Sequence, residues 1–93
     1  MSEEKRKLTG LFLNEKAVRI LISLCDENIN TPADISKEIG CFYTYTLKVL
    51  NELESLSLVK SKKVGRIRIV ELTEKGEKIA GLFDKLMIEM KGD

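Results

Sequence analysis

The side chains best suited to chemistry in this sequence are cations that cluster in one short segment. Ammonium and guanidinium groups bind phosphate oxygens through charge-assisted hydrogen bonds. The segment has no acidic residue between its five cations, which are Lys60, Lys62, Lys63, Arg66 and Arg68. This pattern favours contact with a polyanion. The alternative is that the cations only protect an exposed β-hairpin from aggregation.

The charge distribution of the whole chain supports the first interpretation. Residues 41 to 70 contain six cations and two acids, which gives +4, whereas the remainder contains ten cations and thirteen acids, which gives −3. The net charge is only +1, so total charge alone does not indicate a nucleic-acid-binding protein. One basic region on a mildly acidic body favours binding of a polyanion in one orientation.

The two cysteines are the other reactive side chains. Cys25 and Cys41 lie sixteen residues apart and the chain has no histidine, so neither cysteine belongs to a zinc-ligand spacing. We expect free, buried thiols, and a disulfide within the chain or across a dimer is the alternative that the sequence leaves open. Neither cysteine has a base partner and no glycine-rich phosphate loop is present, so we expect no enzyme activity, no metal and no cofactor.

Length and composition suit one small globular domain. The chain has 93 residues, of which 43% are hydrophobic and 33% charged, and it contains no apolar run long enough to span a membrane. Its first seven residues, Met1 to Lys7, form a charged segment without the apolar stretch of a secretory signal. We therefore expect a cytoplasmic protein with a flexible tail over residues 1–7.

Strong helix signals precede the basic segment. Thr31 can cap a helix, Pro32 fits its first position, and Gly40 can end it in a left-handed conformation. A longer helix over about 42–55 follows at once. Another helix, over about 14–26 with Asn14 as its cap, precedes this pair. The order predicts a helix, a tight turn and a helix.

Two β-branched runs around the cations predict a hairpin, and a last helix follows it. The strands cover about 58–63 and 66–72, with a turn at Val64-Gly65, and Thr73 caps the next helix. That helix carries an apolar stripe that no later element could cover, formed by Ile79, Leu82, Phe83, Leu86, Met87 and Met90. We therefore expect a homodimer built on this stripe, with Leu11 and Phe12 contributing to the interface.

The predicted fold class is α+β: a winged helix-turn-helix with a three-helix core, a two-stranded hairpin wing and a C-terminal dimerisation helix. The expected divisions are the tail over 1–7, the winged helix-turn-helix domain over 8–76 and the dimerisation helix over 77–93. Helix, turn, helix and basic hairpin in this order are typical of proteins that bind duplex DNA.

About two thirds of the chain resembles the winged-helix regulators of the MarR and ArsR type. The resemblance rests on three motifs: Ala33-Asp34-Ile35-Ser36-Lys37-Glu38-Ile39-Gly40, Leu53-Glu54-Ser55-Leu56-Ser57-Leu58-Val59 and Leu72-Thr73-Glu74-Lys75-Gly76. Ser57 stands where that pattern usually has glycine. In size and lysine content the chain is also similar to minimal winged-helix proteins of thermophilic archaea and their viruses, and a viral protein would act in the host cytoplasm.

The resemblance implies a homodimeric transcription regulator that places one helix per subunit in the major groove of double-stranded DNA. The candidate contacts on the helix over 42–55 are Phe42, Tyr43, Thr44, Leu47, Lys48 and Asn51. The five wing cations would then hold phosphates or enter the minor groove. A small-molecule effector is not expected in so small a chain. The alternative function is a winged-helix module for protein contacts that has no specific DNA binding.

Overall fold

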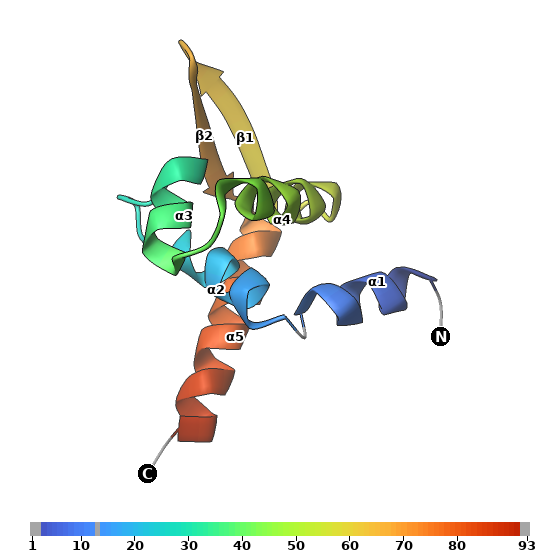
Figure 1. Cartoon of the computed structure of the whole chain (residues 1–93). Helices are drawn as coiled ribbons and strands as arrows, with labels where there is room; N and C mark the ends of the chain where they lie inside the picture. The colour runs from blue at the N-terminus through green and yellow to red at the C-terminus, as the bar shows by residue number, and fades with distance from the viewer. Residues whose placement is uncertain (1–2, 13, 92–93) are drawn as a thin grey trace.

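The computed structural model describes residues 3–12 and 14–91 of the chain. Its elements, in chain order, are α1 Glu3–Phe12, α2 Glu15–Ser23, α3 Pro32–Ile39, α4 Tyr43–Ser55, β1 Val59–Val64, β2 Ile67–Leu72 and α5 Glu74–Lys91. Helices α2, α3 and α4 form a central body, the antiparallel hairpin β1–β2 projects from it, and α1 and α5 extend away from it (Figure 1). The predicted α+β fold class is confirmed.

The local helix signals act as predicted. The side chain of Asn14 accepts hydrogen bonds from the backbone N–H groups of Lys16 and Ala17 at the start of α2. The Thr31 hydroxyl accepts from the Asp34 N–H at 3.1 Å, and Gly40 ends α3 in the left-handed region. Helix α2 ends at Ser23, earlier than the expected end near residue 26.

One apolar core joins the three central helices to the base of the hairpin. Fully buried side chains come from α2, α3, α4, both strands and α5, and they include Ile20, Leu21, Ile35, Leu50, Leu53, Val59, Val70 and Ala80. The backbone N–H of Val70 also donates to the Asn30 carbonyl at 2.7 Å. The root of the wing is therefore fixed to the body by apolar packing and by a backbone hydrogen bond on the far side of β2.

Helix α5 starts in direct contact with the corner between α4 and β1. The Thr73 hydroxyl donates to the Ser57 carbonyl at 2.6 Å and accepts from the Gly76 N–H at 2.9 Å, so it caps α5 as predicted. A Cβ atom on Gly76 would lie only 1.9 Å from the Leu58 carbonyl oxygen. Glycine at position 76 therefore allows the helix to approach the backbone at the root of the wing.

The bounds of two elements differ from the expected ones. Residues 3–12, whose first part was expected to be a flexible tail, form α1. Glu3 and Glu4 lie in its first turn, where acidic side chains interact favourably with the helix dipole. The wing loop is Gly65-Arg66 because Val64 pairs with Ile67, and Gly65 adopts a φ of 66° in this two-residue connection. None of the helices within residues 3–12 and 14–91 combines the length and the hydropathy that a membrane span requires.

Candidate nucleic-acid interface

Helix α4 divides into a buried face and a solvent-facing face. Thr46, Val49, Leu50 and Leu53 are buried against the core. The opposite face exposes Tyr43, Thr44, Lys48 and Asn51 and leaves Leu47 partly exposed. Five of the six side chains expected to contact DNA therefore lie on one accessible face of α4, and they offer hydroxyl, ammonium and carboxamide groups.

The sixth residue, Phe42, precedes the first turn of α4. Its side chain is 83% exposed and its backbone is extended, with no side chain capping the helix. The buried Thr46 hydroxyl lies 2.8 Å from the Ser36 hydroxyl and 3.1 Å from the Cys41 sulfur. These contacts fix the start of α4 against α3, so the turn between the two helices holds Phe42 and Tyr43 outward.

The wing cations fall into two groups. Lys60, Lys63 and Arg66 are exposed, and none of the three makes an ion pair within residues 3–12 and 14–91. Lys62 lies 3.4 Å from Glu71 on the neighbouring strand, and both side chains remain well exposed. A phosphate could therefore compete for Lys62 at little cost, since exposed ion pairs contribute little stability.

Arg68 is placed differently from the other wing cations. Its side chain is only 25% exposed and its guanidinium lies 3.8 Å from the Glu54 carboxylate of α4. The Ser61 hydroxyl donates to the same carboxylate. Arg68 is thus engaged on the face of the hairpin that meets α4, and its position favours orienting the wing over contacting a ligand. The sequence did not indicate this pairing.

Comparison with solved structures decides the fold. The crystal structure of AF1382 from Archaeoglobus fulgidus superposes with a TM-score of 0.81 at 26% sequence identity, covering 86% of this chain and 92% of that one. The chain is a winged helix-turn-helix protein. An uncharacterized A. fulgidus protein is 27% identical over 97 residues, covering 100% of this chain and 99% of its own length. No family model matches the sequence.

Two bacterial proteins have the same winged-helix fold. MepR of Staphylococcus aureus, a transcription regulator of the multidrug efflux pump MepA, gives a TM-score of 0.78 at 20% identity over 96% of this chain and 67% of its own. A variant of Lactococcus lactis ZitR gives 0.74 at 25% identity over 83% of this chain and 54% of its own. These neighbours confirm the predicted resemblance to winged-helix regulators of the MarR type.

The stripe predicted on α5 is covered only in part. Ile79 and Phe83 pack against the core of this chain, whereas four others, Leu82, Leu86, Met87 and Met90, are exposed. Leu11, which was expected at an interface between chains, is buried in the core of this one, and the side chain of Phe12 lies outside the described residues. Ile88, which the predicted stripe does not include, is 62% exposed and lies on the other side of α5.

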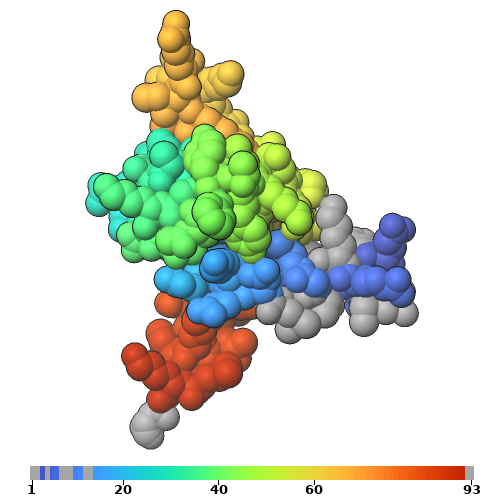
Figure 2. Space-filling model, viewed as in Figure 1, coloured from blue at the N-terminus to red at the C-terminus, as the bar shows by residue number. Residues whose placement is uncertain are grey.

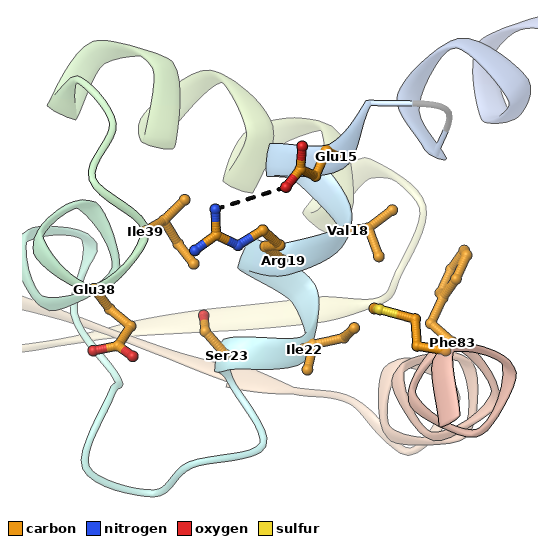
Figure 3. Close-up of a pocket in the computed structure, with 9 residues that line it drawn as sticks. Glu15, Val18, Arg19, Ile22, Ser23, Glu38, Ile39 and Phe83 are labelled. Atoms are coloured by element: carbon orange, nitrogen blue, oxygen red, sulfur yellow. Dashed lines mark ion pairs between the residues drawn. The ribbon is translucent and has the colours of Figure 1, made fainter. Parts of the chain in front are cut away.

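A groove runs beside the exposed part of α5. It has a volume of about 660 Å³ and lies between α2, the end of α3 and α5. Figure 3 shows Val18 and Ile22 of α2 facing Phe83, with the Arg19–Glu15 ion pair of 3.9 Å farther along α2. Met87 also lines the groove, so its apolar part continues directly into the uncovered stripe of α5.

The cysteines show no site chemistry. Both are free, so the disulfide within the chain that the sequence left open is not formed. Cys25 is exposed, which corrects the expectation of two buried thiols, since α2 ends just before it. Partial burial together with the nearby carboxylates of Asp84 and Glu77 raises the pKa of the Cys25 thiol, which disfavours a reactive thiolate. The described residues contain no cluster of potential metal ligands.

Proposed function

We propose that this protein is a transcription regulator that binds specific sites in double-stranded DNA as a homodimer. Helix α4 would enter the major groove, where Tyr43, Thr44, Leu47, Lys48 and Asn51 read base edges and Phe42 contacts the groove wall. Lys60, Lys62, Lys63 and Arg66 would bind the backbone beside the adjacent minor groove. Arg68 would hold the wing at the angle that this requires.

The observation that carries the proposal is the direct contact between α4 and the hairpin. The polar face of α4 and the cationic hairpin are joined directly through Glu54, so a helix and a wing are presented together. MepR, which shares the fold, has been crystallised in complex with DNA, with a TM-score of 0.74 to this chain. The fold shared with MepR, the polar face of α4 and the cations of the hairpin therefore support the same partner.

The direct test is selection of bound sites from random duplex DNA, followed by measurement of affinity against salt concentration. We expect enrichment of a site with two similar half-sites and an affinity that falls steeply with salt, because bound cations displace counterions from the phosphates. Absence of enrichment together with salt-independent or undetectable binding would contradict the proposal. The exposed Phe42 and Tyr43 would then support the protein-contact alternative.

The exposed face of α4 gives the first prediction. Tyr43→Ala, Lys48→Ala and Asn51→Ala should each narrow the gap between the selected site and random DNA, by about 1 to 3 kcal/mol where the side chain makes a bidentate base contact. Competition binding with both DNAs measures this gap. Asn28→Ala is the matched control, because Asn28 is exposed in the loop between α2 and α3. If all three variants fold normally and keep the parent's preference, α4 does not read DNA.

The wing gives a second prediction with a different signature. The triple variant Lys60→Ala, Lys63→Ala, Arg66→Ala should weaken binding to selected and random DNA alike. Each lost phosphate contact should reduce the magnitude of the slope of log affinity against log salt by about 0.9. A triple variant of exposed α5 cations, Lys78→Ala, Lys85→Ala and Lys91→Ala, removes the same three charges and controls for the change in net charge. An unchanged slope in the wing variant would mean that its cations are only solvated surface.

The homodimer is proposed from the uncovered part of α5. Leu82, Leu86 and Met90 recur every four residues, and Met87 connects this row to the groove beside α2. A small protein that exposes such a contiguous apolar surface has an interaction site there. A second copy of the same helix fits this surface by symmetry, since a twofold axis brings identical apolar rows together. It would also cover the groove.

A further inference from the structure

The tip of the wing is apolar, although the segment around it is cationic. Val64 and Ile67 are the last cross-strand pair before the Gly65-Arg66 loop, and their side chains are 58% and 56% exposed. In the space-filling view, the end of the hairpin forms a narrow projection beyond the rest of the molecule (Figure 2). The pair is therefore presented to solvent at the point of the wing farthest from the core.

The fold does not explain this exposed pair. Side chains alternate along a strand, so Val64 and Ile67 lie on the opposite face of the hairpin from Ser61 and Arg68, which bond to Glu54. An exposed hairpin end usually carries polar or charged residues, because apolar ones promote aggregation. Any role of these two residues therefore depends on a partner that the wing meets.

Charge identifies the chemistry of that partner. Lys62 and Lys63 immediately precede the pair and Arg66 lies within the loop, and the nearest acid along the strands, Glu71, already faces Lys62. Docking of the tip against an apolar protein surface would remove water from these cations without providing an anionic partner, which is energetically unfavourable. A partner that combines an anionic rim with an apolar interior satisfies both groups, and the minor groove of duplex DNA has phosphates on its edges and deoxyribose C–H groups on its walls.

We propose that Val64 and Ile67 make an apolar contact inside the minor groove while the adjacent cations hold the flanking phosphates. This inference rests on the proposed function and adds a mode of recognition to it. Neighbouring strands lie about 4.8 Å apart and the minor groove of B-DNA is about 6 Å wide, so only the side chains at the tip can enter. Apolar side chains that enter this groove respond to its width and to the deformability of base steps.

The test uses Val64→Thr with Ile67→Thr, which keeps β-branched residues and therefore the strand propensity of the hairpin. Affinity for the selected site should fall about tenfold. The slope of log affinity against log salt concentration should stay unchanged, because no phosphate contact is lost. Hydroxyl radicals attack deoxyribose hydrogens in the minor groove, so a protein bound there protects the DNA from cleavage. In hydroxyl-radical footprinting, the threonine variant should no longer protect the positions beside each half-site. The control is Lys63→Ala with Arg66→Ala, which removes cations and keeps the apolar pair. This variant should make affinity depend less steeply on salt concentration.

The outcomes separate this inference from the proposed function. If the threonine variant keeps both the parent affinity and the parent footprint, the apolar contact does not exist and the proposed function stands. If the unmodified protein binds no duplex DNA, both are overturned. If the threonine variant changes the oligomeric state measured by sedimentation without DNA, the tip is a contact between copies of the chain, which also overturns the inference. An unchanged melting temperature verifies that the hairpin remains folded.

Discussion

The Gly76→Ala variant should lose a large part of the stability of the winged fold. The added Cβ would lie 1.9 Å from the Leu58 carbonyl oxygen and 2.9 Å from its carbonyl carbon, so backbone atoms must move to accommodate it. Movement of α5 would also strain the hydrogen bonds of Thr73 to Ser57 and Gly76. We expect the free energy of unfolding to fall by about 3 kcal/mol, as in severe overpacking of a core.

Gly81→Ala on the same helix is the matched control. Gly81 is exposed and a Cβ there would meet nothing within 4 Å, so the substitution should be neutral or stabilise the helix by about 0.5 to 1 kcal/mol. Denaturant unfolding followed by circular dichroism compares the two variants. Equal stability of the Gly76→Ala and Gly81→Ala proteins would show that α5 does not approach the wing root as closely as described.

The double variant Leu82→Asp with Leu86→Asp should convert the proposed dimer into monomers. Both side chains are more than half exposed in one chain, so the substitutions leave its own core intact, unlike a change at Phe83. Burial of each leucine at an interface is worth about 1.5 to 3 kcal/mol before the costs of association, and buried aspartates would add a desolvation penalty. Sedimentation at tens of micromolar measures the oligomeric state.

Ile88→Asp gives the control for that experiment. Ile88 is exposed on α5, but at about 100° per residue it lies across the helix from the row of Leu82 and Leu86. This variant should remain dimeric. The monomeric variant should also bind a two-half-site DNA much more weakly, because the second recognition helix is no longer delivered at high effective concentration. An unmodified protein that sediments as a monomer would contradict the proposed assembly.

The features that the sequence predicted correctly depend on neighbouring residues. Asn14, Thr31 and Thr73 each cap a helix through a backbone N–H two or three residues away, and such bonds need no knowledge of the rest of the fold. The alternation of buried and exposed positions on α4 follows equally from its 3.6-residue period. Local spacing of residue types was therefore sufficient to predict the helix-turn-helix and the polar face of α4.

The features that the sequence did not predict depend on distant residues. Arg68 has the same residue type and spacing as the other wing cations, and only the fold brings it to Glu54, fourteen positions earlier in the chain. The burial of Leu11 likewise depends on how α1 meets the body, which no local pattern determines. The predicted wing loop was one residue out of place because β-branched Val64 and Ile67 extend the strands to the tip.

The shared carboxylate of Glu54 has a consequence for the spacing of the two proposed DNA contacts. Ser61 and Arg68 of the wing both bond to this one residue of α4, which restricts the angle between the hairpin and the helix. Because that angle is restricted, the protein holds the exposed face of α4 and the tip of the hairpin at a fixed distance from each other. The major-groove contact and the neighbouring minor-groove contact must then be separated by the same distance on the DNA. DNA sequences whose helical twist matches this length would bind without deformation, so base pairs that no side chain touches would still influence affinity.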